Sequence, residues 1–165
     1  MKLVMTLLVR DEQDIIRDNL EYHLAQGVDF FIATDNRSVD ATTNILKEYE
    51  ERGLLHYIFE GSDEFNQHAW VTRMARIAYS EYGADWIINN DSDEFWWPLN
   101  GNLKEVFERL PKDVNVVFSN RLNFVVVDGG ASEPFWSSMV YREVESFNMR
   151  GRVLRPKIAH TGSAD

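Results

Sequence analysis

The sequence predicts an α/β fold in which a mostly parallel central sheet is flanked by helices. Between residues 3 and 90, short apolar runs alternate with longer amphipathic segments. Each amphipathic segment ends at a glycine, and a polar loop follows each apolar run. Strict alternation of strand and helix is typical of parallel sheets joined by right-handed crossovers. A length of 165 residues suits one core, so we expect a single domain over residues 1–165.

The elements of this region follow from apolar periodicity and from capping residues. The predicted strands are residues 3–9, 30–33, 54–59 and 86–90, all short and rich in apolar side chains. The predicted helices are residues 11–26, 41–53 and 67–82, in which apolar residues recur three or four positions apart. We expect Asp11 to cap the first helix and Ser38 or Asp40 to cap the second.

Beyond Pro98 the predicted elements become shorter. An amphipathic segment predicts a short helix, and three apolar runs predict strands, over residues 102–110, 114–118, 124–127 and 156–159. No helix closes the chain after the last of these strands. We therefore expect a shortened sequence that lacks part of its C-terminal region.

Composition excludes several classes of function. The formal net charge of −10 argues against a broad nucleic-acid surface and against binding to anionic membranes. The chain has no cysteine, which excludes disulfides and thiolate-based metal sites. The first apolar run is too short to span a bilayer, and Arg10 and two acids follow it directly. We expect a soluble, cytoplasmic protein without a transmembrane segment.

The most informative stretch follows the fourth predicted strand. Three acids, Asp91, Asp93 and Glu94, come within four residues of one another after the apolar run of residues 86–88. Ligands bind at the carboxyl edge of open α/β sheets, and carboxylates two residues apart on an extended chain point to one side. A pair of carboxylates suits a hard divalent cation, Mg²⁺ or Mn²⁺, that takes further ligands from phosphates and water. The alternative is a solvated acidic turn.

Three blocks of sequence together resemble the GT-A glycosyltransferases, specifically the family 2-like group. Residues 9–12, Val-Arg-Asp-Glu, resemble the step from the first strand into a basic-Asn-Glu motif. Residues 35–42, Asp-Asn-Arg-Ser-Val-Asp-Ala-Thr, resemble the Asp-Asp-Gly-Ser-x-Asp-Gly-Thr loop, and residues 91–95 resemble Asp-x-Asp-Glu-Phe. This resemblance implies a Rossmann-like GT-A domain, with residues 1–98 as the half that binds a nucleotide-sugar and residues 99–165 as the acceptor-side half.

The resemblance also implies roles for individual residues. Asp93 would ligate the metal on the donor diphosphate, and Asp91 would bind the ribose or support the metal. Thr6 at the end of the first strand, with Asp35 and Asn36 after the second, would line the nucleotide. Helix capping is the alternative role for Asp35.

Three further candidates are weaker. Gln67 opens the third helix, whose N-terminal amides favour an anionic donor, although a solvated first turn is the alternative. His160 would be a further metal ligand, because a late histidine serves this role in several GT-A enzymes. Glu133, beside a Gly-Gly turn, is the candidate catalytic base.

The expected function is transfer of a sugar from a nucleotide-sugar, most simply a UDP-sugar, to a glycan or other hydroxyl acceptor. The resemblance implies dependence on Mn²⁺ or Mg²⁺ and inversion at the anomeric carbon. One alternative is an inactive or truncated GT-A domain that binds a nucleotide or a protein. A phosphatase of the Asp-x-Asp type is disfavoured, because its nucleophile follows the first strand and the acids here follow the fourth.

Overall fold

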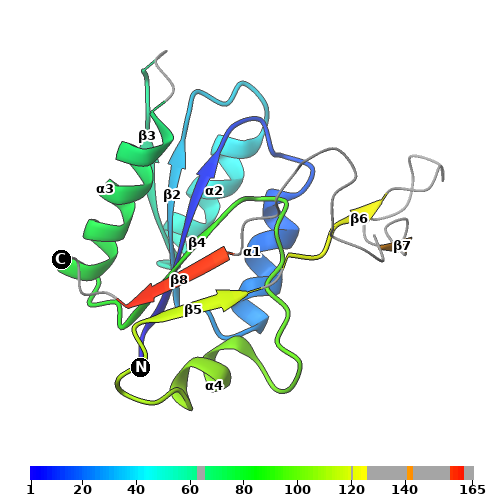
Figure 1. Cartoon of the computed structure of the whole chain (residues 1–165). Helices are drawn as coiled ribbons and strands as arrows, with labels where there is room; N and C mark the ends of the chain where they lie inside the picture. Colours follow the sequence, from blue (N-terminus) through cyan, green and yellow to red (C-terminus); the bar gives the residue numbers. More distant parts are fainter. Residues whose placement is uncertain (63–65, 120, 126–140, 143–156, 162–165) are drawn as a thin grey trace. The chain divides into compact units, whose positions relative to one another are not determined.

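The computed structural model describes residues 1–62, 66–119, 121–125, 141–142 and 157–161 (Figure 1). The chain divides into two compact units. The first unit comprises residues 1–117 and 159–165, and the second comprises residues 118–158. All the candidate residues that follow the four predicted strands lie in the first unit.

The first unit is built on four parallel strands in the order β3-β2-β1-β4. Their bounds are Leu3–Val9 for β1, Phe30–Asp35 for β2, Leu55–Phe59 for β3 and Trp86–Asn90 for β4. The sheet continues with β8 (Lys157–Thr161), which is antiparallel to β4, and then with β5 (Val116–Ser119). The predicted α/β class and its mostly parallel sheet are therefore confirmed. In the second unit, β6 (Phe124–Val125) pairs with β7 (Tyr141–Arg142).

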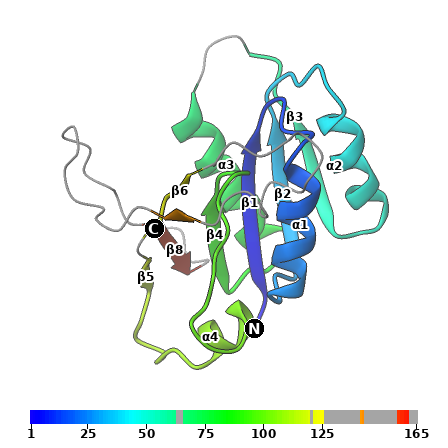
Figure 2. The same cartoon turned by 90° about the vertical axis from the view of Figure 1, so that its right-hand side faces the viewer.

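Three helices cover the two faces of this sheet (Figure 2). Helices α1 (Ile16–Ala25) and α2 (Thr42–Glu51) lie on one face, and α3 (Gln67–Ser80) lies on the other. The alternation of β1 explains this division: Met5 packs in one buried cluster with Leu20 and Leu46, whereas Val4 packs with Met74 of α3. A short helix, α4 (Leu103–Glu108), packs its Phe107 ring against Trp86.

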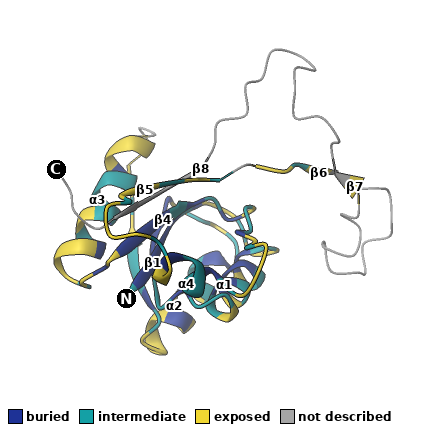
Figure 3. Ribbon diagram, turned by 60° about the horizontal axis from the view of Figure 1, so that its bottom comes forward, coloured by how far each residue is buried: buried dark blue, intermediate teal, exposed yellow. Residues whose placement is uncertain are grey.

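Burial is concentrated in β1, β2 and β4, and the outer faces of the helices are exposed (Figure 3). In β1 every residue except Leu8 is buried, as the apolar sequence predicts for a central strand. Among the residues that the structure describes, none of the helices combines the length and apolar character needed to cross a membrane.

The first helix begins later than the sequence predicts, because Asp11 does not cap it. Asp11 has a φ of +54°, in the left-handed region that non-glycine residues seldom adopt. Its carboxylate accepts a hydrogen bond from the backbone N–H of Val39 at 2.7 Å instead. Helix α1 starts after Ile15, without a side-chain cap. The residues between β1 and α1 therefore form a loop that is tied to the neighbouring strand's loop.

Candidate functional site

The strand order places a topological switch between β1 and β4. The chain moves from β1 outward to β2 and β3, and then returns through α3 to β4 on the other side of β1. Loops that leave the two strands at such a point turn in opposite directions and open a crevice at the carboxyl edge. The loop after Val9 and the loop after Asn90 meet at this edge.

The loop after β4 presents one acid to solvent. We call residues 91–96 the acid loop. Asp91 is half-buried, Ser92 is buried and Asp93 is exposed, while the backbone N–H of Glu94 closes a turn on the Asp91 carbonyl at 3.0 Å. The exposed carboxylate of Asp93 is available to a ligand, as the hypothesis of a metal site requires.

Glu12 adds a carboxylate from another loop to the three in the acid loop. It lies on the loop after β1, and Ser92 donates a side-chain hydrogen bond to it. Partial burial raises the pKa of Glu12 above its ordinary value, and the negative charge of Asp93 raises it further. The charge of Asp93, on the loop after β4, thus acts on Glu12, on the loop after β1. The resemblance covers Glu12, but residue spacing alone gives no sign that it reaches Asp93.

The loops after β1 and β2 are joined by reciprocal hydrogen bonds between side chains and backbone. The backbone N–H groups of Asp11 and Glu12 donate to the hydroxyls of Ser38 and Thr42 at 3.0 and 2.8 Å. The carboxylate of Asp40 accepts from the backbone N–H groups of Gln13 and Thr42. Burial opposes ionisation of Asp40, but these hydrogen bonds outweigh it and lower its pKa. Asp40 thus accepts from the first residue of α2 from outside the helix. The N-cap position is Ala41, which has no side-chain cap, so neither Ser38 nor Asp40 takes the predicted N-cap position.

Asp35 is placed differently from its predicted role. Its carboxylate is fully buried and accepts three hydrogen bonds, from the Ser38 backbone N–H at 2.9 Å, the Thr43 hydroxyl at 2.6 Å and the Tyr57 hydroxyl at 3.1 Å. Burial raises the pKa of Tyr57, and the charge of Asp35 raises it further. The carboxylate is therefore closed off from solvent and joins the loop after β2 to α2 and β3. It does not cap α2 either, because the N-cap is Ala41 and has no side-chain cap.

Asn36 also has an internal role. Its side chain is 5% exposed, and its amide donates to the backbone carbonyls of Glu60 and Ser62 at 3.3 and 3.2 Å. These bonds join the loops that follow β2 and β3. Asn36 therefore shapes the carboxyl edge without presenting its amide nitrogen to solvent.

Asp35 provides a direct test of this geometry. Asp35→Asn should lower the free energy of unfolding by about 2–4 kcal/mol, because an amide nitrogen would face hydrogen-bond donors in a buried position. Urea denaturation followed by tryptophan fluorescence measures the change. The control Glu51→Gln, on the exposed end of α2, should stay within about 0.5 kcal/mol of the parent. Unchanged stability together with lost UDP binding would show that Asp35 contacts the nucleotide instead.

Thr6 does not lie at the end of its strand. It is in the middle of β1, paired with Ile32 on one side and Asn89 on the other. The residue is 1% exposed, and its hydroxyl is 2.6 Å from the side-chain oxygen of Asn89. The strand runs to Val9, as predicted, so the placement of Thr6 at its end was wrong. Thr6 lies three residues before the last residue of β1, away from the carboxyl edge.

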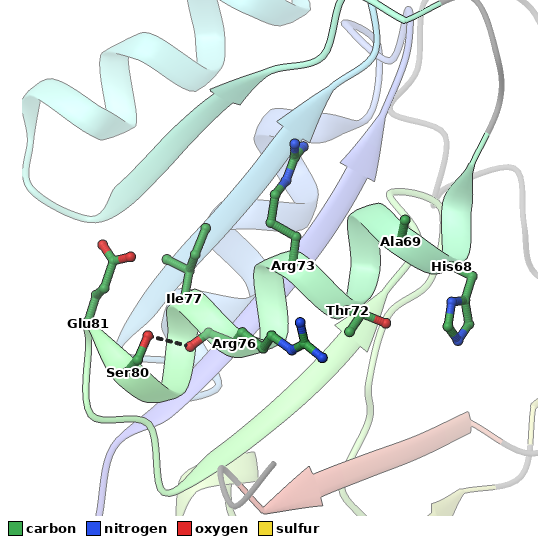
Figure 4. Close-up of a pocket in the computed structure, with 8 residues that line it drawn as sticks. All are labelled: His68, Ala69, Thr72, Arg73, Arg76, Ile77, Ser80 and Glu81. Carbon is green, nitrogen blue, oxygen red and sulfur yellow. Dashed lines mark hydrogen bonds between the residues drawn. The ribbon is translucent and has the colours of Figure 1, made fainter. Parts of the chain in front are cut away.

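Gln67 is the first residue of α3 and is exposed. Asn66 caps this helix, because its side-chain oxygen accepts the Ala69 backbone N–H at 3.2 Å. A hollow of about 420 Å³ lies along the side of α3 (Figure 4). Its described lining comes from α3 and the residue that follows it: His68, Ala69, Thr72, Arg73, Arg76, Ile77, Ser80 and Glu81. None of the predicted donor-binding residues lines this hollow.

Arg73 connects α3 to the carboxyl edge. Its Nη1 atom lies 3.1 Å from the carboxylate of Glu60, the residue that follows β3. Its Nε and Nη2 atoms are buried and have no hydrogen-bond partner among the described residues. The hydroxyl of Thr34, which precedes Asp35 in β2, is likewise buried without such a partner. The sequence shows no pattern that distinguishes Arg73 from a surface arginine.

The structure does not bring His160 to the acid loop. In β8, His160 pairs with Ile87, four residues before Asp91 along β4. At about 3.3 Å per residue, that separation is roughly 13 Å along the strand. The prediction of His160 as a metal ligand is therefore not supported by the register. Glu133 lies outside the described residues, which contain no group of three or more acids, histidines or cysteines arranged to hold a metal.

The acid loop is held from the side of α1 by buried polar side chains. The Asn19 amide donates to the carbonyls of Ser92 and Glu94 at 2.8 and 2.9 Å. His23 Nε2 accepts the backbone N–H of Trp96 at 3.2 Å. Both side chains are fully buried. No motif in the sequence points to these contacts, which join residues more than seventy positions apart.

Several solved structures of glycosyltransferases are similar to parts of the chain. TarS from S. aureus shares 18% identity over 58% of this chain and 28% of its own, with a TM-score of 0.44. The mannosyltransferase PcManGT from Pyrobaculum calidifontis, solved with GDP-Man and Mn²⁺, shares 17% identity over 59% and 29%, with a TM-score of 0.47. Glucosyl-3-phosphoglycerate synthase from Mycobacterium tuberculosis shares 18% identity over 56% and 33%, with a TM-score of 0.41. The chain thus spans a third or less of the length of each.

The sequence itself identifies the family. A search of curated proteins gave no match. Residues 4–151 match glycosyltransferase family 92. The match covers most of the chain and includes the four parallel strands, except for Leu3 at the start of β1. Family 92 is separate from the family 2-like group that the three motifs resemble, so the narrower assignment is replaced. The chain belongs to glycosyltransferase family 92.

Proposed function

We propose that the chain binds a UDP-sugar at the switch between β1 and β4 and transfers the sugar to an acceptor hydroxyl with the help of a divalent metal. The observation that carries the proposal is the acid loop at that edge, with Asp93 exposed and with Ser92 hydrogen-bonded to the carboxylate of Glu12. The carboxyl edge at a switch point is where α/β folds bind nucleotides. Membership of family 92 supports sugar transfer as the reaction class.

The residues at this edge fit Mn²⁺ or Mg²⁺. Asp93 and Asp91 offer hard oxygen ligands. The pKa of Glu12 is raised first by burial and then by neighbouring negative charges, which a bound cation would neutralise. The described residues form no cluster of three ligands. Such a set suits an ion held by one or two carboxylates and completed by substrate phosphate and water. When bound, the metal would neutralise charge on the leaving diphosphate.

Arg73 and Thr34 are candidates for contacts with the nucleotide. Both have buried polar atoms without a hydrogen-bond partner among the described residues, and both lie near the carboxyl ends of β2 and β3. A buried donor without a partner is costly, so a ligand that accepts from it gains affinity. A phosphate or ribose oxygen would satisfy the guanidinium of Arg73. Gln67, at the start of α3, remains a proposed donor contact.

In the proposed reaction the acceptor oxygen attacks the anomeric carbon while the bond from that carbon to the diphosphate oxygen breaks. A single displacement of this kind inverts the configuration. The acceptor proton passes to a carboxylate base, for which Glu133 is the proposed residue, and the electron pair of the broken bond leaves with UDP. The residues described at the edge would orient the donor for this attack.

The proposal is tested by isothermal titration of the chain with UDP, with and without Mn²⁺, beside assays of UDP-sugar hydrolysis and transfer. We expect UDP to bind more tightly with Mn²⁺ and hydrolysis to depend on the metal. Metal-dependent binding without hydrolysis or transfer to any acceptor would favour the alternative of a nucleotide-binding module. A UDP affinity that is the same with and without Mn²⁺ would contradict the proposed metal site.

Arg73→Met should weaken UDP binding by about 10- to 100-fold, because a hydrogen bond from a charged donor contributes about 1.5–3 kcal/mol. Arg76→Met is the matched control: it changes the same charge on the same helix, but Arg76 is exposed and leaves α3 in a different direction (Figure 4). Its affinity should equal that of the parent. Titration with UDP gives both values, and equal losses in the two variants would assign the effect to general charge.

A further inference from the structure

The backbone of the acid loop is fixed by side chains that no substrate can touch. Asn19 and His23 are one turn apart on α1 and have no exposed surface. Together they satisfy two carbonyls and one N–H of the loop, at Ser92, Glu94 and Trp96. Loops usually satisfy such groups with water, so their burial against one helix is a specific arrangement.

The hydrogen bonds determine which ring nitrogen of His23 carries the proton. Nδ1 lies 2.8 Å from the backbone carbonyl of Asn19, which can only accept, so Nδ1 is the donor. Nε2 is then unprotonated and accepts the Trp96 N–H. Burial lowers the pKa of His23 to about 4, which keeps the ring neutral at physiological pH. Phe95 stacks on this ring, which holds its plane.

Other contacts complete the arrangement from the strand and the helix. The Asn90 amide donates to the carbonyls of Asp91 and Glu94, and the indole N–H of Trp96 donates to the Asn90 side-chain oxygen at 2.9 Å. The hydroxyl of Tyr22 donates to the Trp96 carbonyl. Every one of these bonds ends on the acid loop, between Asp91 and Trp96. Movement of α1 or loss of its side chains would therefore be transmitted to the two acids.

We propose that Asn19 and His23 are positioning residues that hold Asp91 and Asp93 in the geometry required to bind the metal and diphosphate of the donor. This inference rests on the proposed function, because it assigns a purpose to the rigid loop. Some residues do not bind the metal but hold its ligands in place through hydrogen bonds. Replacing such a residue commonly weakens metal affinity by about 10–100-fold. Neither side chain contacts substrate, so their effect is exerted through the backbone of the acid loop.

The experiment compares His23→Leu, His23→Gln and Asn19→Asp. Leucine removes both ring hydrogen bonds, whereas the glutamine oxygen can still accept from the Trp96 N–H. Aspartate keeps the size of Asn19 but sets a carboxylate against two carbonyls. We expect His23→Leu and Asn19→Asp to weaken Mn²⁺ binding in the presence of UDP by about tenfold or more, and His23→Gln to restore most of it. UDP binding in EDTA should change little.

Leu46→Ala is the matched control, because it removes a fully buried side chain from α2, a helix that has no hydrogen bond to the acid loop among those described. It should lower the melting temperature while leaving Mn²⁺ affinity unchanged. Amide hydrogen exchange over residues 91–97 should be faster in His23→Leu than in Leu46→Ala. Equal Mn²⁺ affinity in the parent and His23→Leu would overturn the positioning role. A parent chain that shows no Mn²⁺-dependent UDP binding would instead refute the proposed function.

Discussion

Asp93→Asn should reduce Mn²⁺-dependent UDP binding and any sugar transfer by at least about 100-fold, because it removes the charged oxygen that the exposed end of the acid loop offers to a cation. The substitution keeps the size of the side chain and one acceptor oxygen, but it removes the negative charge and replaces the other oxygen by an NH2 group. Asp93 is exposed, so its replacement should not disturb the core. Titration with UDP at several Mn²⁺ concentrations, beside a transfer assay, measures the loss.

Asp113→Asn is the control for this experiment. It removes the same charge from an exposed acid that lies far along the chain, after α4. Its Mn²⁺ affinity should match the parent. The pKa of Glu12 adds a second readout, since removal of the neighbouring charge at Asp93 should lower it. If Asp93→Asn retained metal-dependent binding, the ion would have to be held elsewhere, and the acid loop would be a solvated turn.

Apolar periodicity predicted the strands well, and with them the position of the acid loop. The run of residues 3–9 forms β1 as predicted, and residues 86–90 form β4. Because the carboxyl ends of parallel strands share one edge of the sheet, the apolar run before Asp91 was enough to place the acids at that edge. The pattern could not give the conformation of each loop. Asp11 looks like a helix cap in the sequence, but its left-handed backbone directs its carboxylate to the next loop.

The roles of individual side chains were harder to predict, because they depend on contacts between distant residues. Asp35 fits a motif that contacts nucleotides, yet Thr43 and Tyr57 enclose its carboxylate. Asn19 and His23 fit an ordinary amphipathic helix, and only the packing of α1 against the acid loop gives them a role. Periodicity specifies which face of an element is buried. It does not specify which buried polar groups will meet.

His23 also makes the stability of the chain depend on pH. In the unfolded chain its pKa is near 6.5, and burial lowers the folded value to about 4. The ring packs against Phe95 and against Tyr22. Burial raises the pKa of Tyr22, so the phenol and the His23 ring are both uncharged near neutral pH. Above pH 6.5 neither the folded nor the unfolded state binds a proton at His23. Below it the unfolded state takes up a proton that the folded state excludes, so stability falls as the pH drops.

The parent chain should therefore lose about 3 kcal/mol more stability than His23→Gln between pH 7 and pH 4, since each unit of pKa difference is worth about 1.4 kcal/mol. Urea denaturation of both chains across this pH range measures their free energies of unfolding. Subtracting one curve from the other removes the contribution of the carboxylates, which the two chains share. The loss should begin near pH 6.5 and level off below pH 4. Because protonation of Nε2 also removes the acceptor for the Trp96 N–H, exchange of that amide should accelerate over the same range. Parallel stability curves for the two chains would mean that His23 is solvated, and that the contact between α1 and the acid loop is open in solution.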